Sequence, residues 1–328
     1  MNDFDTVIHG GPDALGVPAH DFSTNANAAG PCPQALSAIA AADATRYPDP
    51  AYTRLRAQLA QFHGVAPSRI LLAASASEFI FRISAAVASL GGTRVSVPRP
   101  GYGDYARAAR AHGMALVAQD QARLVWLCDP VSPTGETAPA PAAALLPGAA
   151  VVADRAYAPL RLQGDACDLP GAWALWTPNK ALGLTGLRAA YAVAPPGPEA
   201  ARLAARMQLL LPSWPIGAHG VALLASWTEP AVQQWLAHSR ERLREWKQAQ
   251  RVRCEALGWH VLPGDASFFC ARPAGVDVAA LLAHLRAAHG IKLRDAASLG
   301  LPGHVRMNVL PPASQAAFFD AACATLAP

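Results

Sequence analysis

The chain has little charge and very little lysine. Charged residues make up 15% of its 328 residues, and the formal net charge is +4. Lysine occurs only as Lys180, Lys247 and Lys292, so arginine supplies most of the positive charge. The arginines are scattered, apart from R-E-R-L-R-E-W-K at 240–247, which indicates a solvated helix face. Nucleic-acid binding would need a denser basic patch interleaved with aromatic residues, so it is not expected.

Long apolar runs and paired cysteine motifs are also missing. No run of 18 or more apolar residues is present, so no membrane-spanning helix and no membrane partner are expected. The opening M-N-D-F-D-T has no apolar core, which argues against a signal peptide. The six cysteines form no C-x-x-C motif and have no regular spacing. They predict reduced core residues of a cytoplasmic protein, and no metal site is predicted.

Length and apolar content, by contrast, are sufficient for two domains. The chain is 52% hydrophobic, and 328 residues can enclose a sizeable core. We predict an N-terminal arm at 1–33, a large domain at 34–215 and a small domain at 216–328. Near the C-terminus, a helical pattern at 277–289 and the strands I-K-L-R-D and H-V-R-M-N-V predict an antiparallel α+β unit.

The stretch W-T-P-N-K-A-L-G-L-T-G-L-R-A-A-Y, at 176–191, places Lys180 between Thr177 and Arg188. An amine in such an apolar, glycine-punctuated segment is desolvated and favours its neutral, nucleophilic form. This suits a lysine that bonds to an aldehyde such as pyridoxal phosphate (PLP). A hydroxyl and an arginine nearby suit the phosphate of that cofactor. The alternative is an ordinary, partly exposed lysine, and the neighbouring motifs argue against it.

A second candidate lies in V-V-A-D-R-A-Y at 151–157, a buried strand that ends at Asp154. A carboxylate at the carboxyl end of a parallel strand lies where open α/β sheets bind ligands. Asp154 could keep a pyridine nitrogen protonated, and Tyr157 could donate a hydrogen bond to the 3′-oxygen of the ring. The alternative for Asp154 is a helix N-cap.

Two further segments fit the same cofactor. A strand from Ile70 passes through Ser75, Ala76 and Ser77 into a helix, an arrangement that leaves free backbone N–H groups for an anion. Tyr102 follows a Pro/Gly loop after the next strand and could stack on a flat ring, or else pack on its own helix.

Together these motifs resemble the fold-type-I PLP enzymes of the aspartate aminotransferase superfamily, over about 9–309. The [S/T]-x-x-K…G-x-R signature falls on Thr177, Lys180 and Arg188. The resemblance implies a mostly parallel seven-stranded sheet, a smaller α+β C-terminal domain, PLP as the cofactor and a homodimer with a shared active site. It also implies that Tyr47, in R-Y-P-D-P-A-Y, reaches the cofactor phosphate of the partner.

The chain departs from this family's pattern at two places. Asp129 and Ser132 occupy the two Asn positions of N-P-x-N-P-T-G, so a shorter hydroxyl replaces the amide that donates to the 3′-oxygen. The glycine-rich phosphate loop is replaced by Ser75, Ala76 and Ser77, which must use ordinary backbone angles.

The resemblance also assigns the substrate groups. Arg306 corresponds to the arginine that binds the α-carboxylate, and Arg294 to one that binds a phosphate or side-chain acid. The alternative for both is an exposed arginine on an edge strand.

The arm decides which reaction is predicted. H-G-G at 9–11 and D-F-S-T-N-A-N at 21–27 resemble threonine-phosphate decarboxylase of cobalamin biosynthesis, with His9 and Asn25 or Asn27 facing the substrate. We therefore expect decarboxylation of O-phospho-threonine to (R)-1-aminopropan-2-yl phosphate. One alternative is a histidinol-phosphate-like aminotransferase, which would share almost every site residue. A second is a non-catalytic protein of the same fold, and His9 beside two glycines could be only a turn residue.

Overall fold

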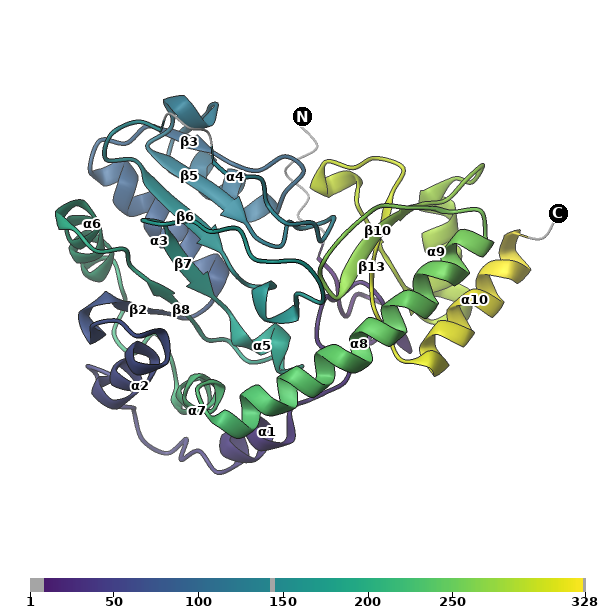
Figure 1. Ribbon diagram of the computed structural model, residues 1–328, viewed down its shortest axis with the longest axis horizontal. Helices are drawn as coiled ribbons and strands as arrows, with labels where there is room; N and C mark the ends of the chain where they lie inside the picture. Colours follow the sequence, from purple (N-terminus) through teal and green to yellow (C-terminus); the bar gives the residue numbers. More distant parts are fainter. Residues whose placement is uncertain (1–8, 142–144, 327–328) are drawn as a thin grey trace.

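The computed structural model describes residues 9–141 and 145–326, which form two sheet-based regions side by side, spanned by the long helix α8 (Pro230–Ala256) (Figure 1). The opening residues, for which no signal peptide is expected, lie outside the described part. Within the described ranges, no helix is long and apolar enough to cross a membrane.

The larger sheet has seven strands and confirms the predicted, mostly parallel architecture. Every pairing is parallel except the two made by β8. In spatial order the strands are β2 (Ile70–Ala73), β8 (Ala190–Val193), β7 (Trp173–Trp176), β6 (Ala150–Asp154), β5 (Leu124–Cys128), β3 (Arg94–Ser96) and β4 (Ala115–Leu116).

Both faces of this sheet are covered. Alternate residues of a strand point to opposite sides, and in this sheet they pack into different hydrophobic clusters. In β2, Ile70 and Leu72 join one hydrophobic cluster, whereas Leu71 and Ala73 join another. This explains why β2 and β5 are continuous apolar runs. The helices of this region are α1 (Pro33–Ala40), α2 (Thr53–His63), α3 (Ala76–Ser89), α4 (Gly103–Ala111), α5 (Pro178–Ala181), α6 (Pro198–Leu209) and α7 (Ala218–Trp227).

The smaller sheet is antiparallel, as predicted, but one expected strand is divided. I-K-L-R-D is not a single strand: β11 (Ile291–Lys292) pairs with β1 (His20–Asp21) of the arm. Only β12 (Arg294–Asp295) joins the four-stranded sheet. The remaining elements of this region are β9 (His260–Val261), β10 (Phe268–Arg272), α9 (Val278–His289), β13 (Val305–Asn308) and α10 (Pro312–Leu326).

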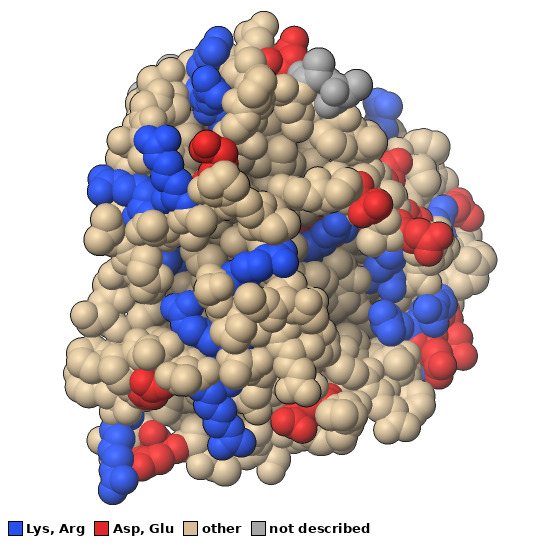
Figure 2. All heavy atoms as spheres, turned by 60° about the vertical axis from the view of Figure 1, so that its left-hand side comes forward, with Lys and Arg blue, Asp and Glu red and all other residues tan. Residues whose placement is uncertain are grey.

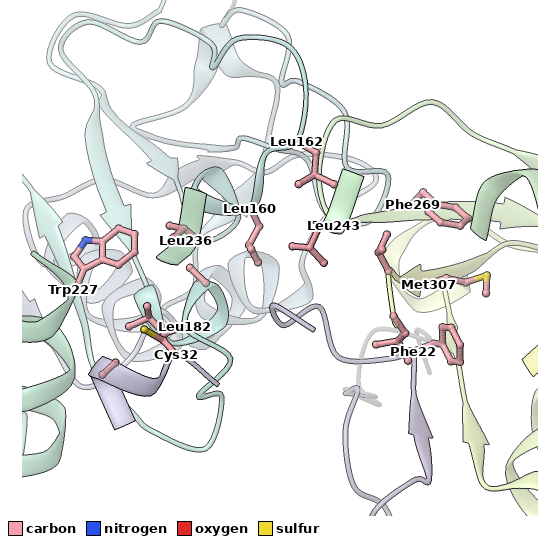
Figure 3. Packing of buried hydrophobic residues seen from close by; sticks show 14 of the residues in the cluster. Phe22, Cys32, Leu160, Leu162, Leu182, Trp227, Leu236, Leu243, Phe269 and Met307 are labelled. Atoms are coloured by element: carbon pink, nitrogen blue, oxygen red, sulfur yellow. The ribbon is translucent and has the colours of Figure 1, made fainter. Parts of the chain in front are cut away.

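One hydrophobic cluster continues across both regions. Leu236 and Leu243 of α8 belong to the same cluster as Leu160 on one side and Met307 on the other (Figure 3). Phe22 of the arm is a further member, so the arm is packed into the core. The division at 34–215 and 216–328 therefore stays a proposal about how the chain is organised.

Candidate active site

A cavity of about 300 Å³ lies at the carboxyl ends of β5, β6 and β7, where the smaller sheet and the arm meet the larger sheet. This is where open α/β sheets bind ligands. All the predicted site residues line it except Asn27 and Tyr47. Those that do are His9, Asn25, Ser75, Ala76, Ser77, Tyr102, Ser132, Asp154, Tyr157, Thr177, Lys180, Arg188, Arg294 and Arg306.

Lys180 is the one lysine of the three that reaches this cavity. It lies in α5, with Nζ 5.4 Å from the centre of the Tyr157 ring. Lys247 is buried and donates to the carbonyl oxygens of Gly264 and Ala266, at 2.5 and 2.8 Å. Lys292 is 3.0 Å from a carboxylate oxygen of Asp13 on the arm. The partners of the other two lysines thus hold them in structural roles.

Asp154 ends β6 as a buried carboxylate with two donors. The Tyr105 hydroxyl donates to Oδ2 at 2.6 Å, and the backbone N–H of Ala156 donates to Oδ1 at 2.9 Å. Burial raises the pKa of Asp154, while these two donors and the charge of Lys180 act in the opposite direction. Asp154 does not cap a helix: the short helical turn that follows has Tyr157 as its N-cap.

The turn before α3 forms a cradle without glycine. Ser75 is the N-cap of α3, and its hydroxyl accepts from the backbone N–H of Glu78 at 3.0 Å. The Glu78 carboxylate accepts from the N–H of Ala74 at 3.2 Å and is paired with the buried Arg82 at 2.7 Å. This reciprocal arrangement is close to a capping box, which can be read from the S-x-x-E spacing. It fixes the start of the helix, where free N–H groups favour an anion.

Thr177 supplies the observation that fits a bound phosphate. Its side chain is buried, and its hydroxyl has no hydrogen-bond partner in the described chain. Buried hydroxyl groups are normally paired, so a ligand is the natural partner. Arg188 also lines the cavity, and its side chain is exposed.

We expect Thr177→Val to weaken PLP binding roughly 10- to 100-fold, since a hydrogen bond to a charged group contributes about 1.5–3 kcal/mol. The unfolding midpoint of the cofactor-free protein should not fall, because the hydroxyl has no protein partner to lose. Fluorescence titration and thermal unfolding measure the two quantities. Thr228→Val is the matched control, because its hydroxyl donates to the carbonyl of Ala225 instead. Unchanged PLP affinity in Thr177→Val would contradict the assignment.

The two positions that depart from the family's pattern have different surroundings. Asp129 is fully buried and forms ion pairs with Arg155 and Arg161, so it is a structural counter-ion outside the cavity lining. Ser132 does line the cavity, and Nη1 of Arg306 lies 3.4 Å from its hydroxyl. Ser132 therefore remains a candidate contact of the cofactor, whereas Asp129 contributes to the packing of the chain around Arg155 and Arg161.

Replacing Asp129 with asparagine should destabilise the protein by about 3–5 kcal/mol, because Arg155 and Arg161 would lose their shared counter-ion. Chemical unfolding of the variant measures this loss. Asp120→Asn, at an exposed position with no ion pair to the described residues, serves as the control. Equal stabilities of the parent and Asp129→Asn would show that the ion pairs are not needed.

Arg294 and Arg306 face each other across the pair β12–β13 and are both buried, so they are not exposed edge arginines. Arg306 donates to the carbonyl of Ser23 at 2.8 Å, and Arg294 donates to the Ser298 hydroxyl at 2.8 Å. Burial and then the neighbouring Arg306 charge lower the pKa of Arg294 to about 10. Two buried guanidinium groups side by side favour an anionic ligand.

The arm places Asn25 in the cavity and directs Asn27 elsewhere. Asn25 is buried, and neither polar atom of its side chain has a partner within the described ranges. Asn27 instead donates to the carbonyl of Ala181 at 2.9 Å, which fastens the arm to α5. The expectation that either asparagine could face the substrate therefore narrows to Asn25.

The glycines of H-G-G have a structural reason that is independent of the reaction. A Cβ on Gly10 would lie 2.3 Å from the carbonyl oxygen of Ser23, and Gly11 has φ +90°. The N–H of Gly11 donates to the Ser23 hydroxyl at 2.9 Å, so the two arm motifs pack on each other. Asp21 holds the turn by accepting from the N–H of Ser23 at 2.9 Å. The H-G-G pattern is therefore explained by the folding of the arm. His9 itself is exposed and lines the cavity.

Tyr47 lies on the surface, outside the cavity lining. Its side chain is 77% exposed and stacks on Trp214, with ring centres 4.4 Å apart. Within one chain it therefore contacts no cofactor group, and its predicted role depends on a second copy.

The sequence reasoning missed Tyr105, which contacts Asp154, and Ser298, which contacts Arg294. Tyr105 follows Tyr102 by three residues, the spacing that places both on one side of α4. That spacing could have identified Tyr105 from the sequence, whereas no local sequence pattern identifies Ser298.

Charge in and around the site is predominantly positive. On the face shown in Figure 2, Lys and Arg side chains follow a hollow across the middle, and most Asp and Glu side chains lie toward the edges. Among the described residues, the cavity lining contains one carboxylate, Asp154, against Arg110, Arg188, Arg294, Arg306 and Lys180. Such a cavity favours a ligand with more than one anionic group.

Comparison with known proteins agrees with this site. The family model for aminotransferase class I and II matches residues 18–120 and 116–324. A histidinol-phosphate aminotransferase of Symbiobacterium thermophilum is 30% identical over 94% of this chain and 91% of its own length. One of Rhodospirillum centenum is 30% identical over 92% of this chain and 90% of its own length.

Solved structures share the fold. Histidinol-phosphate aminotransferase of Sinorhizobium meliloti, in complex with PLP, has a TM-score of 0.79 and 24% identity over 98% of this chain and 96% of that one. L-threonine-O-3-phosphate decarboxylase of Porphyromonas gingivalis has a TM-score of 0.75 and 21% identity over 94% of this chain and 99% of that one.

These comparisons correct the predicted reaction. The prediction of a threonine-phosphate decarboxylase is wrong, because the relatives at about 30% identity over most of the chain are histidinol-phosphate aminotransferases. The predicted cofactor and family are confirmed. The chain belongs to the aminotransferase class I and II family, and its cofactor is pyridoxal 5′-phosphate.

Proposed function

We propose that this protein is a PLP-dependent aminotransferase that acts on a phosphorylated amine of the histidinol phosphate type, with a 2-oxo acid as the acceptor. The observation that carries the proposal is the buried pair Arg294 and Arg306 in the cavity. The groups suited to the cofactor phosphate lie at the ends of α3 and α5 instead. The arginine pair on β12–β13 thus provides a second place for an anion. The names of the relatives supply the amine.

The chain's own residues account for the steps of such a reaction. When bound, PLP supplies an aldehyde that captures the substrate amine and a ring that withdraws electrons from it. Thr177 and the N–H groups at the start of α3 hold the phosphate of the cofactor, and Tyr157 donates to its 3′-oxygen. Asp154 holds a proton on the ring nitrogen. Lys180 anchors the cofactor and then moves the proton at Cα of the substrate.

The arginines orient the substrates. Arg294 binds the phosphate of the amine donor, and Arg306 binds the carboxylate of the 2-oxo acid. Binding energy from the distant phosphate helps to orient the bond that reacts, so it raises the rate as well as the affinity. A non-catalytic role is disfavoured, because the lysine, the carboxylate and the anion site are all present in one cavity.

A homodimer with a shared active site is part of the proposal. The exposed stacked pair Tyr47 and Trp214 supports it, because large aromatic side chains at the surface favour an interface. Light scattering of the purified protein measures the mass in solution, and a monomer at assay concentration would contradict it.

The assay for the proposal combines purified protein, PLP, histidinol phosphate and 2-oxoglutarate. Formation of glutamate in step with loss of histidinol phosphate is expected. A decarboxylase would need no 2-oxo acid. Release of CO2 from phospho-threonine in the absence of 2-oxoglutarate would therefore contradict the proposal.

Arg294→Ala should lower kcat/KM for the phosphorylated amine roughly 10- to 100-fold, through the loss of charged hydrogen bonds of about 1.5–3 kcal/mol. An amine without phosphate should lose little. Arg272→Ala, at an exposed arginine at the end of β10, is the control. An equal loss with both amines would show that Arg294 does not contact the phosphate.

A further inference from the structure

A buried tyrosine with no part in the steps above lies against Asp154. Tyr105 is in the first turn of α4, fully buried, and its hydroxyl donates to Asp154 Oδ2 at 2.6 Å. Its ring stacks on Trp126 of β5, with centres 4.7 Å apart and planes at 19°. Tyr102 meets it edge-on at 5.7 Å. This packing fixes where the hydroxyl lies.

The direction of that hydrogen bond is also fixed. Burial and the adjacent Asp154 charge hold the pKa of Tyr105 well above its ordinary value, so the hydroxyl keeps its proton. Tyr105 is therefore the donor and Asp154 the acceptor. A donor of this kind stabilises the carboxylate relative to the carboxylic acid.

The other groups that face Asp154 do not replace this donor. Cys128 of β5 is a neutral thiol, because burial raises its pKa to about 12. Lys180 of α5 favours the carboxylate through its charge, but it must be displaced when substrate binds. The N–H of Ala156 holds Oδ1 at 2.9 Å. Tyr105 is the one side-chain donor to Oδ2 that stays in place among the described residues.

We propose that Tyr105 is a positioning residue that keeps the Asp154 carboxylate ionised and oriented toward the ring nitrogen of the cofactor. A ring nitrogen retains its proton beside a carboxylate, which accepts a hydrogen bond, but not beside a neutral acid, which offers a donor of its own. The role requires bound PLP but does not depend on which amine is the substrate.

The test removes the Tyr105 hydroxyl and measures cofactor binding without any substrate. Fluorescence titration of cofactor-free protein gives the affinity for PLP and for 1-deazapyridoxal phosphate, in which carbon replaces the ring nitrogen. Tyr105→Phe should bind PLP about 10-fold or more weakly, corresponding to about 1.5 kcal/mol or more. Its affinity for the deaza analogue should equal that of the parent, because Asp154 then has no ring nitrogen to meet.

Tyr52→Phe is the matched control, since Tyr52 is also buried and donates to the carbonyl of Ile216 at 2.7 Å. It should leave both affinities unchanged. Equal PLP affinities of the parent and Tyr105→Phe would overturn the proposal. An equal loss with both cofactors would overturn it as well, because Tyr105 would then only pack the site.

A second variant covers the case in which Tyr105→Phe does not fold. Incorporation of 3-fluorotyrosine at position 105 keeps the ring and makes the phenol a stronger donor. We expect equal or tighter binding of PLP and unchanged binding of the deaza analogue. Weaker binding of PLP alone would contradict the proposal. Because no amine is present, failure here leaves the proposed substrate untouched.

Discussion

Lys180→Ala is expected to abolish turnover, with a loss of roughly 10⁴-fold or more, because the proposed covalent anchor and proton carrier at Cα disappear together. The fold should persist, since Lys180 is only half-buried and no described hydrogen bond involves its amine. The activity assay and circular dichroism measure the two effects.

Borohydride reduction provides the matching chemical result. In the parent protein the pyridoxyl label should appear on the peptide that contains Lys180, and Lys180→Ala should take up none. Lys247→Arg and Lys292→Arg are the controls, because those lysines contact backbone carbonyls and Asp13. A label on either of them would contradict the site.

Asp154→Asn is expected to lower kcat at least on the order of 10²–10³-fold, the loss typical when a preorganised electrostatic partner of the reacting group is removed. Asparagine is nearly isosteric, so the cavity should keep its shape. Steady-state kinetics with saturating PLP separate this loss from weaker cofactor binding.

The same substitution should leave the cofactor-free protein more stable at neutral pH. Burial raises the pKa of Asp154 above that of the unfolded chain, so its ionised form costs folding free energy. That cost is present above the folded pKa and is relieved as the pH falls through it. The difference in unfolding midpoint between Asp154→Asn and the parent should therefore shrink toward acid pH. A difference that grows toward acid pH would contradict the assignment of charge.

The sheet and the cofactor end of the site were predictable from the sequence because each depends on a local pattern. One apolar strand ends in Asp154, and another is followed by Thr177 and, three residues later, by Lys180. These side chains therefore lie at the same edge of the mostly parallel sheet. The start of α8 at Pro230 agrees with the preference of proline for the first turn of a helix.

Contacts between distant segments were not predictable in this way. Asp129 meets arginines 26 and 32 residues later, so its position in the motif could not show that it is their shared counter-ion. The arm misled for a similar reason. Gly10 is required by the close approach of Ser23 and Gly11 by its φ of +90°, and any reaction on this fold could share these backbone constraints.

The central claim, transfer of an amino group from a phosphorylated amine, is tested most directly by a single turnover without a 2-oxo acid. Purified protein with stoichiometric PLP is mixed with histidinol phosphate, and the cofactor is then released and identified. We predict that it is recovered as pyridoxamine phosphate, one equivalent per active site, with no CO2. Addition of 2-oxoglutarate should restore PLP. Recovery of unchanged PLP from histidinol phosphate, together with release of CO2 from phospho-threonine, would contradict the account.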